Sequence, residues 1–340
     1  MKKIVYVGFA FKHHQNTQAG YHHIKDYLLY DYVFDTQWEF DLLSQIQTVW
    51  HKKILAFLLK NTLGVGCPLT ILRCIFFSLF YRNVVFHFIY AEGNYKWLHH
   101  FLGRTNQIVC SFHQPADILE HKYGWRRDLA NINKVILLSE KDRELFKQWT
   151  GKSNVKFIPH GINIDFYSPS SEVKKERIIL MVGNWLRNFD FANQVFNDLL
   201  EQDDFLQVYV VTNEVNFSYF QKHDRLFLET NITDWKLRDL YRRSYLVFLP
   251  LYSYTANNAI MEAAATGCQI VIATNREDPS YFSHDRLDIL PLQKDLVERF
   301  LIKKLDEPYS DQRVLDNRNF VVQNYSWQHV ADLTRKYLLE

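Results

Sequence analysis

The chain has 340 residues, of which 47% are apolar and 23% are charged. This is ordinary usage for a globular protein, and the length suggests about two domains. Lys and Arg number 40 and Asp and Glu number 38, which gives a formal net charge of +2. A balance so close to zero argues against a dedicated polyanion binder, because such a protein carries a clear basic excess.

The charge is distributed unevenly along the chain. Residues 1–168 carry 20 Lys and Arg against 13 Asp and Glu, whereas the remainder is acidic overall. Within the basic half, no Asp or Glu occurs between Asp41 and Glu92. We therefore expect the two halves to face different partners.

The cysteines and the apolar stretches indicate the compartment. The four cysteines form no CxxC pair and are too few for a disulfide framework, which fits a reducing cytosol. The apolar N-terminus is short and runs into Lys12 without a small-residue cleavage site, so it predicts a first strand and not a signal peptide. The longest apolar stretch, residues 69–81, is interrupted by Arg73 and is too short to span a membrane, which takes about 20 residues.

Short runs of β-branched and aromatic residues alternate with helical patterns along the first half, which is typical of βαβ units and a parallel sheet. The strands expected there are residues 3–8, 84–89, 107–111, 134–138 and 155–158, with a helix over 140–149. A segment rich in Pro, Gly, Ser and charge follows. It predicts a first domain of residues 1–168.

The pattern restarts in the second half, which predicts a second domain over residues 169–324. Its expected strands are residues 177–182, 206–211, 225–228, 245–249, 269–273 and 287–290. Its expected helices are residues 189–200, 234–243, 257–266 and 292–305. Apolar residues at helical spacing predict an amphipathic C-terminal helix over 325–340.

Five segments from residue 135 onward occur in an informative order. They are residues 135–145, 155–169 with the sequence Ile-Pro-His-Gly, 178–187, 232–251, and 257–274 with Glu-Ala-Ala-Ala-Thr-Gly. A Tyr-Ser-Trp sequence then opens the last helix. This ordered set resembles the retaining GT-B glycosyltransferases of family four over most of residues 130–340, whereas residues 10–130 match only weakly.

The resemblance implies an α/β fold of GT-B architecture, with two Rossmann-like parallel-sheet domains facing across a cleft and a C-terminal helix that crosses back to the N-terminal domain. It also implies an enzyme that moves a sugar from a UDP- or GDP-linked donor to a hydroxyl acceptor with retention of configuration and without a metal or other cofactor. The acceptor class it suggests is a glycan or lipid-linked saccharide in cell-surface polysaccharide or glycolipid synthesis.

The donor diphosphate is expected at two places in the second half. The turn before the helix over 257–266 offers N–H groups and a positive dipole end to phosphates. The residues concerned are Thr255, Ala256, Asn257 and Asn258. Arg187, after Gly183, suits bidentate phosphate binding. The alternatives are a plain N-cap by Thr255 or Asn257, and a surface arginine.

Glu262 lies in an otherwise apolar helix, where a carboxylate needs partners. The resemblance implies that it holds the donor ribose; the alternative is a solvated helix face. The first glutamate of the family's motif is replaced by Tyr254, in the donor-sugar region, and the lysine that usually follows the arginine is missing. The resemblance places Ile232 near the base.

The first half carries weaker signals. Gly20 resembles the glycine of a loop where a helix N-terminus approaches the donor diphosphate, but it could equally be a turn glycine. His113 ends a strand, and the resemblance implies contact with the donor sugar near the reaction centre, so it is the candidate catalytic residue; the alternative is an ordinary loop histidine. The histidines at 13, 14, 22 and 23 lack a carboxylate or cysteine at ligand spacing, so no metal site is expected.

The acid-free stretch points to the acceptor side. Aromatic and aliphatic residues alternate there with Lys52, Lys53, Lys60 and Arg73. Such segments bind anionic leaflets, so we expect a cytoplasmic protein, peripheral on the inner face of the cell membrane, and no nucleic-acid partner. The alternative is that these helices flank the first sheet and their lysines extend along apolar surface.

Two other functions remain open from the sequence. One is a sugar-nucleotide epimerase of the same fold, which needs an acid/base pair of carboxylates that the sequence does not place. The other is a catalytically inactive glycan- or membrane-binding module, which the missing glutamate and lysine would suit.

Overall fold

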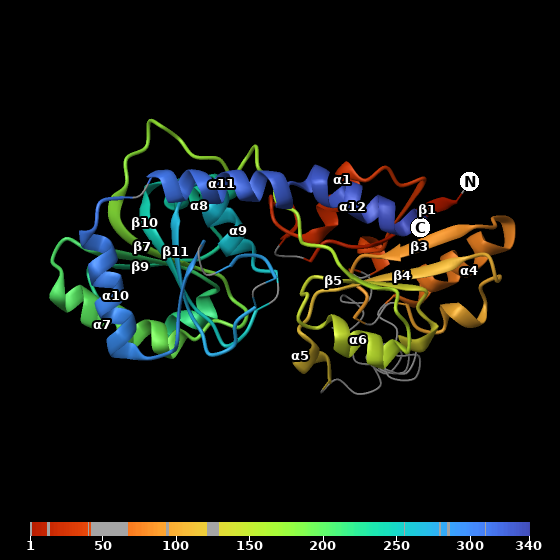
Figure 1. Cartoon of the computed structure of the whole chain (residues 1–340), viewed down its shortest axis with the longest axis horizontal. Coiled ribbons are helices and arrows are strands. Elements are labelled where there is room, and N and C mark those ends of the chain that lie inside the picture. The colour runs from red at the N-terminus through yellow and green to blue at the C-terminus, as the bar shows by residue number, and fades with distance from the viewer. Residues whose placement is uncertain are drawn as a thin grey trace. The chain divides into compact units, whose positions relative to one another are not determined.

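The structure is a computed structural model that describes residues 2–11, 14–39, 41, 67–92, 95–120, 129–254, 256–278, 280–283, 286–309 and 311–340. The strands of these residues form two sheets, each with six parallel strands. Each sheet belongs to its own unit of the chain, and the two units are described in turn (Figure 1).

The first sheet has the spatial order β2-β1-β3-β4-β5-β6. Its strands are β1 (Lys3–Gly8), β2 (Tyr32–Asp35), β3 (Val84–Phe88), β4 (Gln107–Phe112), β5 (Lys134–Leu137) and β6 (Val155–Phe157). Helices α4 (Pro68–Phe80), α5 (Ala116–Glu120) and α6 (Arg143–Thr150) contribute to the apolar core on one face. Helices α1 (Ile24–Tyr27) and α12 (Trp327–Leu339) pack together on the other face (Figure 1).

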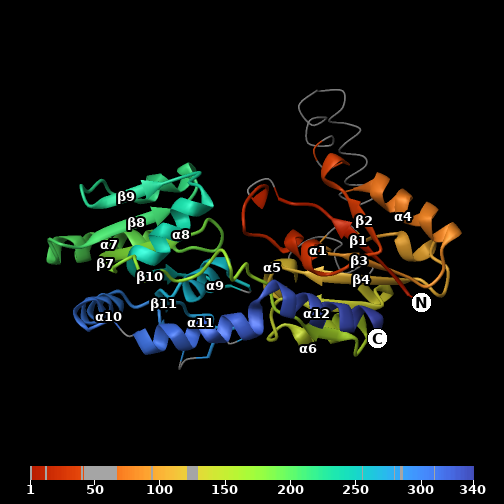
Figure 2. The ribbon, with the colours of Figure 1, turned by 90° about the horizontal axis from the view of Figure 1, so that it is seen from above.

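The second sheet has the spatial order β12-β11-β10-β7-β8-β9. Its strands are β7 (Glu176–Val182), β8 (Gln207–Val211), β9 (Leu226–Glu229), β10 (Ser244–Pro250), β11 (Gln269–Ala273) and β12 (Asp288–Leu290). Helices α7 (Phe189–Gln202) and α10 (Lys294–Asp306) share one core with the sheet. Helices α8 (Asp234–Arg243) and α9 (Asn258–Ala265) cover the other face, and α11 (Asp311–Tyr325) packs on α9 (Figures 1 and 2).

The division between the units differs by a few residues from the expected one. The first unit comprises residues 1–161 and 327–340, and the second comprises 162–326. Residues 162–168 group with the second unit because Arg318 of α11 donates to the carbonyls of Ile164 and Tyr167, and Arg242 of α8 donates to that of Ser168.

The last helix begins two residues later than expected. Tyr325 ends α11, where its ring contacts those of Tyr281 and Phe282 in the second unit. Trp327 begins α12 in the first unit and is fully buried against Gly161 and His160. At the other end of α12, Lys134 Nζ donates to the carbonyl of Tyr337 over 2.6 Å.

β2 and α11 were not expected from the sequence, and neither were the short helices α1 and α5. β2 has four residues and forms an edge of the sheet, so its apolar pattern is too short to stand out. The exposed face of α11 is rich in amides and charges, and its attachment to the second unit relies partly on Arg318, whose sequence context predicts no contact. In the parts of the chain that the structure describes, no helix combines the length and apolar character needed to cross a membrane.

We predict that Gly161→Ala destabilises the first unit. A Cβ at this position would lie 2.2 Å from the ring of Trp327, which is buried and has nowhere to move. Overpacking of this kind costs about 1–3 kcal/mol. Urea unfolding followed by tryptophan fluorescence measures the loss. Gly103→Ala is the control, because a Cβ there meets no atom closer than 4.0 Å, and equal midpoints for both variants would contradict the packing argument.

Candidate functional site

The strand order of the second sheet locates its binding edge. β7 and β10 are neighbours, and the chain runs outward from them in opposite directions along the sheet. In open α/β sheets, ligands bind outside the carboxyl ends of the strands at this switch point. The loops that leave β7 and β10 pair there, because Asn188 N–H donates to Pro250 O over 2.9 Å and Tyr252 N–H donates to Leu186 O over 3.0 Å.

Arg187 folds back over the end of β7. Its Nε donates to Val182 O over 2.9 Å, its Nη1 to Trp185 O over 3.0 Å, and its Nη2 to Asn257 Oδ1 over 3.2 Å. Gly183 makes this possible, because a Cβ there would lie 2.4 Å from Nη2 and its φ is +118°. Burial lowers the pKa of Arg187 to about 10, so the guanidinium stays cationic at neutral pH.

Asn257 links this cation to the N-terminus of α9. It is the N-cap of α9, since its Oδ1 also accepts from Ala259 N–H over 3.2 Å. Asn257 is only 8% exposed, yet among the described residues its Nδ2 has no hydrogen-bond partner. An oxyanion would suit all three groups, because a buried amide N–H, a guanidinium and a helix N-terminus each interact favourably with negative charge.

Glu262 lies one turn further along α9 and is 4% exposed. Tyr241 of α8 donates its hydroxyl to Glu262 Oε2 over 2.9 Å. Burial raises the pKa of Glu262 to about 7, although the Tyr241 hydrogen bond opposes the shift. The structure thus places Glu262 inside the unit and not on a solvated helix face.

The other residues expected in the second unit lie along the same edge of the sheet. Ala256 and Asn258 flank Asn257, and Asn258 is the first residue of α9. Tyr254 is buried in the loop after β10, and its hydroxyl oxygen accepts a hydrogen bond from the backbone N–H of Asp278. Ile232 follows β9 and is half-buried. Thr255 lies outside the described residues.

Gly20 and His113 come together in the first unit. Gly20, with φ +107°, precedes the 3-10 turn Tyr21–His23, which is followed by the four-residue helix α1. Tyr21 N–H donates to Tyr90 OH over 3.0 Å, and the ring of His113 lies 4.5 Å from that of Tyr90 and 4.9 Å from that of Tyr21. Burial lowers the pKa of His113 to about 3, so its ring is neutral at physiological pH.

Of the four basic residues expected on the acceptor side, the structure describes only Arg73. Lys52, Lys53 and Lys60 lie outside the described residues. Arg73 is exposed on α4 and places its guanidinium 4.1 Å from the ring centroid of Phe34. The same face of α4 exposes five large apolar side chains by 45–70%. They are Leu69, Leu72, Phe76, Leu79 and Phe80. Glu39 fixes the start of α4 by accepting from Leu69 N–H and Thr70 N–H.

The sequence did not reveal the contact of Tyr241 with Glu262, or the role of Gly183 under Arg187. Tyr241 occupies a buried position of an amphipathic helix, which indicates burial but not its partner. Within the described residues, no group of three or more His, Cys, Asp or Glu side chains is placed to hold a metal ion.

The sequence matches no family model and no curated protein. Solved structures, by contrast, are similar in fold. Anabaena HepE in complex with UDP and glucose has a TM-score of 0.69 and 12% identity, with 100% of each chain covered. Trehalose-6-phosphate synthase OtsA has a TM-score of 0.68 and 12% identity, with 100% of this chain and 99% of that chain covered.

TarM has a TM-score of 0.63 and 12% identity over 80% of this chain, and the match spans 58% of the length of TarM. At such identities the likeness shows the fold alone. The chain therefore has the α/β GT-B architecture, with two Rossmann-like parallel-sheet domains.

We predict that Glu262→Gln flattens the pH dependence of stability. The folded-state pKa of about 7 lies above the ordinary 4.5, so this group stabilises the fold most below pH 4.5 and its contribution is lost as pH rises through 7. The loss is at most about 3 kcal/mol. Glutamine keeps an acceptor for Tyr241 but cannot ionise. Urea unfolding at pH 5 and pH 8 should therefore show a smaller fall for the variant, and an equal fall in both proteins would contradict the assignment.

Proposed function

We propose that the protein is a glycosyltransferase that takes a sugar from a UDP- or GDP-linked donor. The observation that carries the proposal is the group formed at the switch point by Arg187, Asn257 and the N-terminus of α9. It combines a fixed cation, an unsatisfied buried amide and a positive helix end. The sequence resemblance supports it, and so does a similar fold that binds UDP and glucose in HepE.

We propose a role for each group in the donor site. Three of the five N–H groups of Arg187 are used within the protein, which leaves two for the diphosphate. Asn257 Nδ2 and the N–H of Asn258 add neutral donors, with Ala256 and Thr255 in the adjoining turn. Two fixed neutral donors beside one fixed cation compensate for the lysine that the family usually carries. Charge on the leaving diphosphate is then stabilised without a metal.

Glu262 accepts hydrogen bonds from the ribose diol, and Tyr241 holds one of its oxygens in place. The carboxylate is the better acceptor, so nucleotide affinity rises as pH passes the pKa of Glu262. Ile232 borders the base and Tyr254 the donor sugar. In the first unit, Gly20 approaches the diphosphate and the neutral ring of His113 contacts the sugar.

The reaction retains anomeric configuration in this proposal. The acceptor hydroxyl attacks the sugar from the face that the diphosphate leaves, and the leaving phosphate takes the acceptor proton. The protein contributes by orienting both substrates and by stabilising phosphate charge. The acceptor is a glycan or lipid-linked saccharide of cell-surface polysaccharide or glycolipid synthesis.

The acceptor side of the proposal rests on α4. Its five exposed apolar side chains, with Arg73 beside them and no acid in residues 42–91, suit the surface of an anionic leaflet. The protein is then cytoplasmic and peripheral on the inner face of the membrane.

We predict that UDP or GDP raises the melting temperature, and that sugar nucleotides release nucleotide when extracted membrane lipids are present. Arg187→Met and Asn257→Ala should each weaken nucleotide binding by about tenfold or more, since each removes hydrogen bonds to a charged group. Arg299→Met is the control, because Arg299 is exposed on α10. No thermal shift and no release with any donor would refute the transferase; binding without release would indicate an inactive module.

We predict that a Phe76→Ser/Leu79→Ser variant sediments less with vesicles rich in phosphatidylglycerol. Both side chains are about two-thirds exposed, so the fold should tolerate the change. Phe205→Ser is the matched control, because Phe205 is exposed in the second unit. Neutralising Lys52, Lys53 and Lys60 tests the basic part of the patch. Equal sedimentation of the wild type and all variants would exclude this surface from membrane binding.

A further inference from the structure

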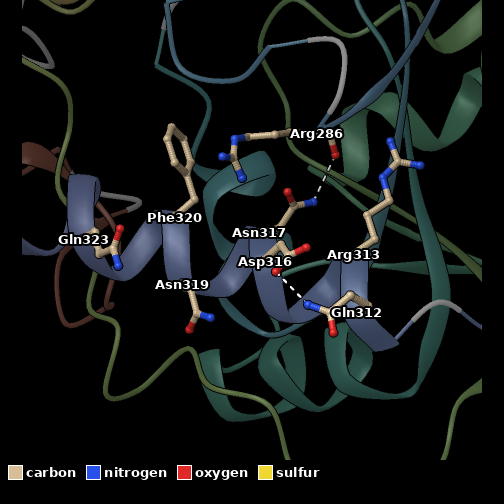
Figure 3. Close-up of a pocket in the computed structure, with 8 residues that line it drawn as sticks. All are labelled: Arg286, Gln312, Arg313, Asp316, Asn317, Asn319, Phe320 and Gln323. Atoms are coloured by element: carbon tan, nitrogen blue, oxygen red, sulfur yellow. Dashed lines mark hydrogen bonds between the residues drawn. The ribbon is translucent and has the colours of Figure 1, made fainter.

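We propose that a depression on the second unit binds a saccharide that carries one oxyanion, either a carboxylate or a phosphate. The depression has a volume of about 500 Å³ and lies between α11 and the loop before β12 (Figure 3). This volume falls within the range of ligand pockets and exceeds the needs of a free anion. It does not involve the donor residues proposed above.

The central residue is Arg286, whose backbone and side chain are both held by neighbouring residues. Its backbone N–H donates to Ser283 O over 3.0 Å, and its carbonyl accepts from Asn317 Nδ2 over 3.0 Å. Its guanidinium stacks on Phe320 of α11, with Cζ 4.0 Å from the ring centroid. The cation is therefore held in position before any ligand arrives.

A second arginine in the same depression shows what Arg286 lacks. Arg313 binds Asp288 through both Nη1 and Nη2, at 3.0–3.1 Å. Across the described residues, by contrast, no acceptor receives a hydrogen bond from the guanidinium of Arg286, although that group is only half-exposed. The contact with the Phe320 ring takes up none of the guanidinium N–H groups as a donor to an oxygen or nitrogen atom, so they are available to a ligand.

The surroundings define the ligand. A guanidinium edge matches the two oxygens of a carboxylate or phosphate. Exposed amides of Asn319 and Gln323 line the rim, and amides both donate to and accept from hydroxyl groups (Figure 3). Asp316 lies on the same rim, where it accepts from Gln312 over 2.9 Å. A carboxylate there repels a polyanion but accepts from a sugar hydroxyl, so a saccharide with a single oxyanion suits the site best.

The test uses the full chain, without nucleotide, and measures binding of glucuronate, glucose 6-phosphate and glucose by ligand-observed NMR and calorimetry. We expect glucuronate or glucose 6-phosphate to bind, and glucose to bind at least about tenfold more weakly. Preference between the two anions identifies the oxyanion. Arg286→Met should abolish the difference from glucose while leaving the melting temperature unchanged, because Arg286 forms no ion pair within the described part of the chain.

Two further variants make the result specific. Arg299→Met should bind like the wild type, and so should Arg187→Met, which impairs the proposed donor site only. The second control separates failure of this inference from failure of the proposed transferase. Equal binding of all three sugars, absence of binding, or full binding by Arg286→Met would each overturn the proposal.

Discussion

The reversal of strand order between β7 and β10 is the constraint on which the proposed donor site depends. Because parallel strands bring all their carboxyl ends to one edge, the loops after β7 and β10 meet there while their helices diverge. The space between them is closed by Arg187, whose three hydrogen bonds join β7, its own loop and the N-cap of α9. A glycine at 183 is the only residue that leaves room for this guanidinium.

The same arrangement determines the environment in which Glu262 ionises. α9 presents its N-terminus to the ligand side, so Glu262, one turn later, is buried between α9 and α8. Burial favours the neutral carboxyl, whereas the Tyr241 hydroxyl and a bound diol favour the carboxylate. The residue therefore costs stability when it ionises, and in the proposed donor site it would gain partners from a bound diol.

Local patterns were enough to predict most of the fold. Eleven of the observed strands overlap those expected, because buried parallel strands are short apolar runs between turn signals. Arg187, Asn257 and Glu262 could be named from the sequence, but the hydrogen bond between Arg187 and Asn257 could not, since it joins residues 70 positions apart. β2 was missed because its apolar run is only four residues long, and α11 because its attachment relies partly on Arg318, whose sequence context predicts no contact. The periodicity of α8 indicates that Tyr241 is buried but not that its partner is Glu262.

Four arginines of the second unit differ in how many of their N–H groups have acceptors within the protein. This difference helps to separate arginines that hold the fold together from those that could bind a ligand. Arg318 donates to three backbone carbonyls, and Arg313 is matched to Asp288, so both are accounted for by the fold. Arg187 is partly used, and its remaining N–H groups lie beside another unsatisfied donor, Asn257 Nδ2. Among the described residues, the only partner of the Arg286 guanidinium is the ring of Phe320. Since guanidinium N–H groups within a protein cost free energy when they lack acceptors, the arginines that the fold leaves incomplete are those for which a ligand is the simplest physical explanation.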